Sequence, residues 1–375
     1  MQKIKILQIV DSLNSGGMEN IMVQVCNHLD LAKFSVTICC LSSSGPFAQR
    51  LRPEVSVVDL EKPPGFSLGT VRALRRLLKK ENFDLIHTHH LGGLIYAALS
   101  RPILCRRRPR IVHSEHIILY KHELERRRIW QRKLLYPLTS CVFTVSEQQL
   151  EQLRELGLNH RNQFTLRNGV DCKKFHPVPP ESKEALRRQL GLEPGAFWIG
   201  KVARFAPEKR HITLIEAFEI AVAEQPQLRL LLLGDRGSEK ERVLSRIASS
   251  PARDKIHWAG MQQDPVPWYQ ALDALVIASS SEGMPNAALE GMACGLPLLS
   301  NDVCGISEVA SDGEHGWVED LGSVPNLSSA LMRIAVAPSA TLQNFGHASR
   351  QHIERHFSLD EMLETYRALY LGKAV

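Results

Sequence analysis

The 375-residue sequence contains no apolar run approaching the ~18 residues that a membrane-spanning helix needs. Its first residues also lack the form of a signal peptide, because the apolar stretch covers only residues 4–10 and no small-residue cleavage site follows. The eight cysteines, at positions 26, 39, 40, 105, 141, 172, 294 and 304, show no paired spacing typical of a metal site. We therefore expect a cytoplasmic protein whose cysteines are buried free thiols in a reducing compartment.

A dinucleotide fingerprint is also missing. No Gly-x-Gly-x-x-Gly follows the first expected strand, which argues against a dinucleotide-dependent oxidoreductase.

The length suits two domains better than one. Charge is unevenly divided between them. Residues 1–178 hold 27 Lys and Arg against 15 Asp and Glu, a net charge of +12, whereas the remainder holds 19 against 25, a net charge of −6. This asymmetry predicts an anionic partner for the first half of the chain.

Short apolar segments alternate with helix-forming segments along the chain, which is the pattern of parallel sheets with helices on both faces. A proline-rich hinge at residues 177–180 separates two such series. We therefore expect an α/β protein with a basic lobe at residues 1–178, a second lobe at residues 179–356 and a terminal helix over residues 357–375. The expected strands are residues 4–10, 35–41, 55–60, 84–87, 110–114, 141–145, a strand running into a turn within 164–171, 197–205, 228–233, 255–260, 275–278 and 296–299.

Residues 275–300 form a candidate ligand-binding segment. It has the pattern strand, turn, helix, turn, strand, with Pro285 as the first helical residue and Gly295 as the helix stop. The amino end of such a helix presents free N–H groups that suit a phosphate. Glu282 lies at the mouth of the strand, and Glu290 on the helix can accept hydrogen bonds from both hydroxyls of a ribose. The stretch therefore predicts a nucleotide site.

The surrounding residues carry a resemblance to a known family. They are Glu282-Gly283-Met284-Pro285-Asn286 and Glu290-Gly291-Met292-Ala293-Cys294-Gly295-Leu296-Pro297. This segment resembles the Glu-x7-Glu signature of family 4 of the retaining glycosyltransferases. The resemblance extends over nearly the whole chain and implies the GT-B architecture, in which two facing Rossmann-like, doubly wound lobes enclose a cleft. In that architecture the terminal helix commonly crosses back to the first lobe.

The resemblance also implies an activity. A UDP- or GDP-linked sugar would be transferred, with retention of its anomeric configuration, to a glycan or lipid-linked acceptor in cell-surface polysaccharide or glycolipid synthesis. No Asp-x-Asp occurs in the sequence, so a metal-clamped diphosphate is not expected. The nucleotide-diphospho-sugar would be a substrate, and no cofactor is expected.

Four residues would have catalytic roles by this resemblance. Arg204 and Lys209 follow one strand, where a basic pair can hold a diphosphate and stabilise the departing nucleotide. His116 follows another strand and would lie near the donor sugar. Glu282 would contact the sugar hydroxyls; two carboxylates also suggest a covalent nucleophile, but we favour Glu282 as a positioning group.

Further residues are expected to bind the nucleotide. Gly16 and Gly17 form the turn after the first strand, where backbone N–H groups can approach an anion. Gly234 ends a buried strand in a turn that allows close backbone approach. The full set is Gly16, Gly17, Gly234, Gly283, Met284, Asn286 and Glu290.

The other histidines near strand ends are expected to be structural. They are His87, His89, His90 and His113. The histidines near strand ends form two clusters, at residues 87–90 and 113–116. Neither cluster has two histidines at i, i+4 spacing with an intervening glutamate, so zinc is disfavoured.

The basic half contains a candidate membrane surface. Within an expected helix at residues 123–138, Trp130, Leu134 and Leu138 form an apolar stripe. The stripe and its basic neighbours would suit anionic lipid heads, but a core-facing stripe with a solvated basic face fits equally well. No recognised motif supports nucleic acid. The neighbouring bases are Arg72, Arg75, Arg76, Lys79, Lys80, Arg106, Arg107, Arg108, Arg126, Arg127, Arg128, Arg132 and Lys133.

Two alternatives to glycosyl transfer are compatible with the same two-lobed fold. A nucleotide-sugar epimerase would convert the donor without an acceptor. A non-catalytic partner subunit is less consistent with a chain that carries Arg204, Lys209, Glu282 and Glu290 together.

Overall fold

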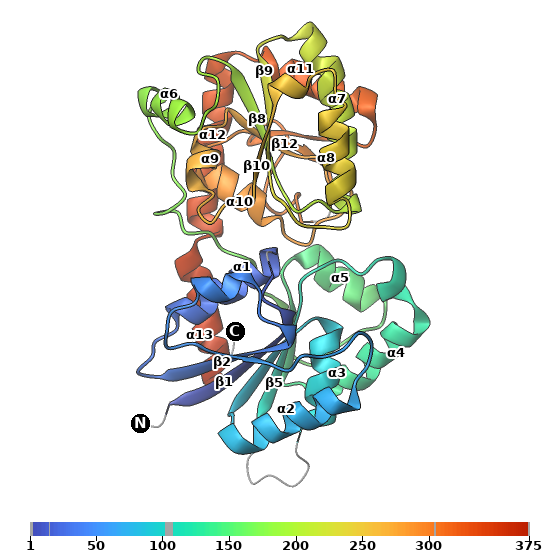
Figure 1. Ribbon diagram of the computed structural model, residues 1–375. Coiled ribbons are helices and arrows are strands. Elements are labelled where there is room, and N and C mark those ends of the chain that lie inside the picture. Colours follow the sequence, from blue (N-terminus) through green and yellow to red (C-terminus); the bar gives the residue numbers. More distant parts are fainter. Residues whose placement is uncertain (1–2, 15, 102–107, 304, 374–375) are drawn as a thin grey trace. The chain divides into compact units, whose positions relative to one another are not determined.

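The computed structural model describes residues 3–14, 16–101, 108–303 and 305–373. It divides into two compact units (Figure 1). Unit 1 comprises Met1–Asn168 and Glu361–Val375, and unit 2 comprises Gly169–Asp360. Cys105, Arg106, Arg107 and Cys304 lie outside the described residues.

The unit boundaries differ from the expected ones at residues 178 and 356. Val170 already pairs with Ser358 in a parallel bridge. The Val170 N–H donates to the Phe357 carbonyl at 2.8 Å, and the Leu359 N–H donates to the Val170 carbonyl at 3.0 Å. These bonds hold residues near Val170 and Ser358 together within unit 2. The first boundary therefore lies before the proline-rich hinge, and the second lies after residue 356.

The described part of unit 1 contains a seven-stranded parallel sheet of order β3-β2-β1-β4-β5-β6-β7. The sequence order reverses between β1 and β4, which creates a switch point at their carboxyl ends. The strands are β1 (Ile4–Ser12), β2 (Phe34–Ser43), β3 (Ser56–Asp59), β4 (Leu85–His89), β5 (Arg110–Glu115), β6 (Cys141–Thr144) and β7 (Gln163–Thr165). The helices are α1 (Gly17–His28), α2 (Leu68–Glu81), α3 (His90–Ser100), α4 (Arg126–Leu135), α5 (Glu147–Glu155) and α13 (Leu359–Leu371). Short 3-10 turns are η1 (Pro46–Arg50), η2 (Lys121–Leu124) and η3 (Tyr136–Leu138).

Alternation along the strands gives this sheet two different faces. Leu7, Ile9 and Ile86 face one way and join an apolar core with α2, α3 and α5. The intervening Gln8 and His87 face the other way, toward Tyr370 of α13. The sheet is therefore covered on both sides.

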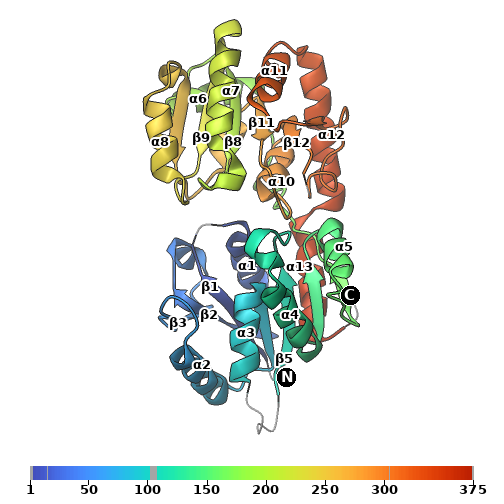
Figure 2. The ribbon, with the colours of Figure 1, turned by 90° about the vertical axis from the view of Figure 1, so that its right-hand side faces the viewer.

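The described part of unit 2 contains a six-stranded parallel sheet of order β10-β9-β8-β11-β12-β13, with its switch point between β8 and β11. Apolar residues of α7, α8 and α11 pack on one face (Figures 1 and 2). The strands are β8 (Phe197–Val202), β9 (Leu228–Leu233), β10 (Ile256–Gly260), β11 (Ala274–Ile277), β12 (Leu298–Asn301) and β13 (Gly316–Glu319). The helices are α6 (Pro180–Gln189), α7 (His211–Glu224), α8 (Lys240–Ala248), α9 (Val266–Gln270), α10 (Asn286–Ala293), α11 (Val324–Ala335) and α12 (Ser339–His356). Two 3-10 turns are η4 (Pro207–Lys209) and η5 (Arg253–Lys255).

Two local expectations need correction. Pro285 is the residue before the first turn of α10 rather than its first helical residue. The helix expected at residues 123–138 is broken into η2, α4 and η3. Pro137 explains the second break, because it has no N–H to continue the α-helical bonding, and the chain tightens into a 3-10 turn.

The expectation of two doubly wound α/β lobes is confirmed. Gly295 ends α10 as expected, in the left-handed region at φ 73°. Among the described residues, no helix combines the length and the apolar character needed to cross a bilayer.

Candidate active site

The two loops at the switch point of unit 2 carry the predicted charged residues. One loop follows β8 and contains Arg204 and Lys209, and the other follows β11 and contains Glu282. Backbone bonding joins the loops, because the Ser280 N–H donates to the Glu208 carbonyl at 2.8 Å. The structure therefore brings together residues that lie about 70 positions apart in the sequence, at the edge where open parallel sheets bind ligands.

Lys209 and Glu282 form a close ion pair. Lys209 Nζ lies 2.7 Å from each carboxylate oxygen of Glu282. Their side chains are only 16% and 11% exposed, so solvent screens the attraction less than at an open surface. Arg204 is separate from this pair, since its guanidinium donates to Glu208 at 2.8 Å and is 56% exposed. The pair fixes Glu282 beside a cation, whereas Arg204 retains access to solvent.

Glu290 lies on α10 and has a partner that sequence reasoning missed. The Tyr269 hydroxyl of α9 donates to Glu290 Oε2 at 2.8 Å. Tyr269 is fully buried, and burial together with the Glu290 charge raises the pKa of its hydroxyl. The hydroxyl therefore stays protonated and orients the carboxylate. No spacing rule connects Tyr269 to Glu290, because the two residues come from separate elements.

The glycines of unit 2 are placed by close backbone contact. A Cβ on Gly234 would collide with the Ala203 carbonyl, and one on Gly305 would collide with the Gly283 carbonyl. Met284 is buried beside Gly283, and Asn286 begins α10. The backbone at the end of β8 therefore leaves no room for a side chain at position 234, and only glycine fits there.

Gly16 and Gly17 lie between β1 and α1 at the switch point of unit 1. Gly16 is extended, at φ −168°, and immediately precedes the helix that Gly17 begins. The space above Gly16 is occupied by the Glu19 carboxylate, which a Cβ at position 16 would meet. The glycine thus gives the first turn of α1 room for an acidic side chain.

His116 follows β5 and belongs to a buried polar network. His116 Nε2 lies 2.8 Å from Ser114 Oγ and 3.0 Å from His89 Nδ1. The network continues through Gln8 to the Tyr370 hydroxyl, which also contacts His87 at 2.9 Å.

Burial governs the ionisation of these histidines. It lowers the pKa values of His87, His89 and His116 well below the usual histidine value, with mutual repulsion adding to the effect. His116 is therefore a neutral imidazole at pH 7, suited to hydrogen bonding rather than to holding an anion.

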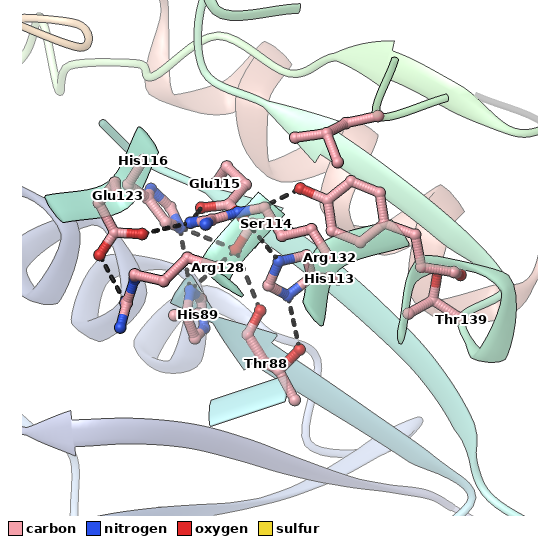
Figure 3. A network of polar contacts seen from close by, with 12 residues as sticks. Thr88, His89, His113, Ser114, Glu115, His116, Glu123, Arg128, Arg132 and Thr139 are labelled. Carbon is pink, nitrogen blue, oxygen red and sulfur yellow. Dashed lines mark hydrogen bonds and ion pairs between the residues drawn. The ribbon is translucent and has the colours of Figure 1, made fainter. Parts of the chain in front are cut away.

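Glu115, which follows Ser114 and faces the opposite way from it, anchors further polar contacts, and Figure 3 draws them together with His89, Ser114 and His116. Glu115 Oε1 accepts from Arg132 Nε at 2.7 Å and from the Tyr136 hydroxyl at 3.0 Å. Arg132 Nη2 also donates to Glu123 at 2.7 Å, and Glu123 accepts from Arg128 at 2.6 Å. These bonds tie α4 and η2 to the end of β5, one residue before His116.

The prediction that Arg132 lies on a solvated or lipid-facing basic surface is therefore wrong, because the residue is buried. It is 1% exposed and surrounded by carboxylates. Its position on the buried side of α4 explains the difference, because Trp130 and Leu134, two residues to either side, are 63% and 55% exposed. The predicted apolar stripe is thus on the solvent side of α4, not in the core.

The described residues contain no cluster of three or more His, Cys, Asp or Glu arranged to hold a metal ion.

Both halves of the chain match family models. Residues 15–174 match the model described as Glycosyltransferase Family 4, and residues 182–352 match the model described as Glycosyl transferases group 1. Together the two matches cover most of the sequence.

Curated enzymes similar to this chain include one that matches it along its whole length. The UDP-Gal:alpha-D-GlcNAc-diphosphoundecaprenol alpha-1,3-galactosyltransferase of Escherichia coli is 24% identical, with 100% of this chain and 98% of that protein covered.

Solved structures that share its fold include two of known context. Anabaena HepE in complex with UDP-glucose has a TM-score of 0.85 and 19% identity, with 98% of this chain and 100% of that chain covered. WaaG, a glycosyltransferase involved in lipopolysaccharide biosynthesis, has a TM-score of 0.78 and 15% identity, with the same coverage. These likenesses identify the GT-B fold.

The buried ion network of unit 1 predicts a large stability effect. Substituting Arg132→Met leaves Glu115 and Glu123 without their shared cation, which should lower the free energy of unfolding by about 3–5 kcal/mol. Urea denaturation followed by circular dichroism measures the change. The matched control is Arg126→Met on the exposed side of the same helix, for which we expect a change within about 0.5 kcal/mol. Equal effects of the two substitutions would contradict this description.

Proposed function

Because this chain belongs to family 4 of the glycosyltransferases, we propose that it transfers a sugar from a UDP- or GDP-linked donor with retention and without a metal ion. The proposed acceptor is a glycan or a lipid-linked glycan. The observation that carries the proposal is the pairing, at one switch point, of Lys209 with Glu282 and of Glu290 with Tyr269. It provides a cation for a diphosphate and an oriented carboxylate for a ribose.

Charge on the departing nucleotide is the main chemical demand of this transfer. Lys209 supplies a partly desolvated cation, and Arg204 supplies a planar guanidinium that can replace Glu208 with a phosphate. The amino end of α10, at Asn286, adds its N–H groups and dipole. With these positive groups in the protein, the diphosphate needs no metal clamp. This assignment agrees with the lack of Asp-x-Asp in the sequence.

The two glutamates have different tasks in this proposal. Glu290, held by the Tyr269 hydroxyl, accepts hydrogen bonds from the ribose. Glu282, held by Lys209, accepts from hydroxyls of the donor sugar. Its bidentate ion pair lowers its nucleophilicity, so we assign it to positioning, with departure and attack on the same face of the sugar. Trapping a glycosyl–Glu282 adduct would contradict this assignment.

Unit 1 supplies neutral groups in the proposal. His116 would hydrogen-bond a sugar hydroxyl as a neutral imidazole, because burial lowers its pKa. The Gly16-Gly17 turn would place backbone N–H groups toward the donor.

The exposed apolar stripe of α4 and η3 supports an acceptor at a membrane surface. Trp130, Leu134 and Leu138 are 63%, 55% and 47% exposed, and Arg126 and Lys133 lie exposed among them. Apolar side chains within a basic field suit anionic lipid heads. The similar Escherichia coli enzyme is named for a diphosphoundecaprenol substrate, which is such a lipid-linked anion. We propose peripheral binding at the cytosolic face of a membrane.

Nucleoside diphosphates should stabilise the protein. We expect UDP or GDP at 100 times its Kd to add about 2.7 kcal/mol to the free energy of unfolding, because a ligand of the native state shifts the equilibrium. Differential scanning fluorimetry with UDP, GDP, ADP and NAD measures this as a rise in Tm. The Glu290→Ala substitution should weaken binding ~10- to 100-fold through loss of a charged hydrogen bond, whereas Glu314→Ala, an exposed glutamate of unit 2, should not. A rise with NAD alone would contradict the proposed activity.

Anionic vesicles should bind the protein at low salt. Replacing Trp130 and Leu134 together by serine should weaken cosedimentation with phosphatidylglycerol vesicles at least ~10-fold, because each side chain loses apolar burial. The control is Val336→Ser in unit 2, which removes an equally exposed apolar side chain. Failure of the wild-type protein to bind such vesicles would remove the membrane part of the proposal and leave the donor site unaffected.

A further inference from the structure

Lys201 lies inside unit 2, near the carboxyl end of β8. Its side chain is 1% exposed, in the middle of a six-stranded sheet. The strand period places it on the same face as Ile199, which packs in the core beneath α7. Among the described residues, its ammonium group has no hydrogen bond and no ion pair. An unpaired lysine in such a place is costly and requires an explanation.

A second unpartnered polar group lies at the same end of the sheet. His211 begins α7, is 3% exposed, and has no hydrogen-bond partner on either ring nitrogen in the described structure. Its ring packs edge-on against Phe205, with 4.7 Å between centroids. Burial, together with the charges of Lys201 and Lys209, lowers the pKa of His211 well below its ordinary value. The histidine is therefore neutral and gives Lys201 no charge compensation.

Two charged neighbours of Lys201, Lys209 and Glu282, are proposed donor-binding residues. Burial lowers the pKa of Lys201 to about 7; repulsion by Lys209 and Arg210 acts in the same direction, and Glu282 opposes it. Glu282 is already paired with Lys209 through both oxygens. In the free protein the Glu282 carboxylate therefore already has a cation, and a neutral amine at position 201 leaves it compensated.

Binding of the donor changes this balance. The diphosphate of a nucleotide sugar brings two negative charges to Lys209 and Arg204. These charges act on Lys201 through a poorly screened interior and favour its ammonium form.

We propose that Lys201 is a positioning residue of the donor site, which acts through Lys209 and takes up a proton from solvent when the donor diphosphate binds. The neutral ε-amine gains one proton and becomes an ammonium ion, and no bond of the donor is broken. Release of the nucleotide reverses the step. This inference rests on the proposed function and adds to it a reason for a buried lysine at the switch point.

The direction of the pH dependence is set by linkage. Binding raises the pKa of Lys201, so donor affinity is greatest where the lysine is protonated in both states. It falls as the pH rises above about 7, by at most tenfold per pH unit, and levels off above the pKa of the complex.

Isothermal titration calorimetry with UDP-glucose at pH 8, in buffers of different ionisation enthalpy, tests this inference. GDP-mannose is the second probe. A nucleotide sugar is preferred to UDP because each of its phosphates carries a single acidic group that is ionised throughout this pH range, whereas the terminal phosphate of UDP titrates near a pKa of ~6. At pH 8 the neutral His211 does not contribute. We expect the wild-type protein to take up most of one proton.

Three variants separate this role from a structural one. Lys201→Met should abolish proton uptake and flatten the affinity profile, so that it binds more weakly than wild type at pH 6.5 and the difference shrinks as the pH rises. Lys201→Arg keeps a permanent cation and should bind without proton uptake. Lys255→Met, which removes a lysine at η5, should behave as wild type.

The outcomes are distinct. Binding heat that is independent of the buffer, or equal proton uptake by Lys201→Met and wild type, would overturn the inference and leave the transferase proposal standing. If Lys201→Met fails to fold, uptake by Lys201→Arg equal to wild type overturns it in the same way. Absence of binding by both nucleotide sugars would remove the proposed function, and this inference with it.

Discussion

The ion pair between Lys209 and Glu282 is the interaction on which the site of unit 2 depends. It joins the loops after β8 and β11, whose strands are neighbours at the switch point of the sheet. Because both side chains are largely buried, breaking the pair would leave an uncompensated charge. The loops are therefore held together before any ligand arrives. Such preorganisation lets the positive groups stabilise a departing anion without first reorganising.

Unit 1 is also held by buried polar contacts, some between neutral groups and some between charged ones. The two faces of β5 have separate tasks: Ser114 joins the histidine network that contains His116, and Glu115 on the other face anchors α4 through Arg132. Successive side chains of a strand point to opposite faces. Ser114 therefore contacts the candidate sugar-binding His116, while the next residue, Glu115, contacts the candidate lipid-binding helix α4. Burial lowers the pKa of His87 and His116 and keeps these histidines neutral. Burial acts to raise the pKa of Glu115, but the charge of Arg132 outweighs it, so the carboxyl stays ionised.

Features that depend on local pattern could be predicted from the sequence, whereas features that depend on tertiary packing could not. The alternating apolar segments indicated the two doubly wound sheets, and strand-end position indicated the neighbourhood of Glu282 and Lys209. The bonds made by Tyr269 and Arg132 were missed, because their partners come from distant elements and a sequence shows only which residues are polar. The unit boundary at Asn168 was also missed, since it depends on a bridge to Ser358. The assigned roles of the site residues remain proposals.

We propose that the switch point of unit 2 holds a nucleoside diphosphate. A crystal structure of the protein with the diphosphate that stabilises it tests this proposal. We expect the ribose hydroxyls within hydrogen-bond distance of Glu290, and the diphosphate against Lys209, Arg204 and the amino end of α10. A nucleotide bound elsewhere, or a ribose out of reach of Glu290, would contradict it.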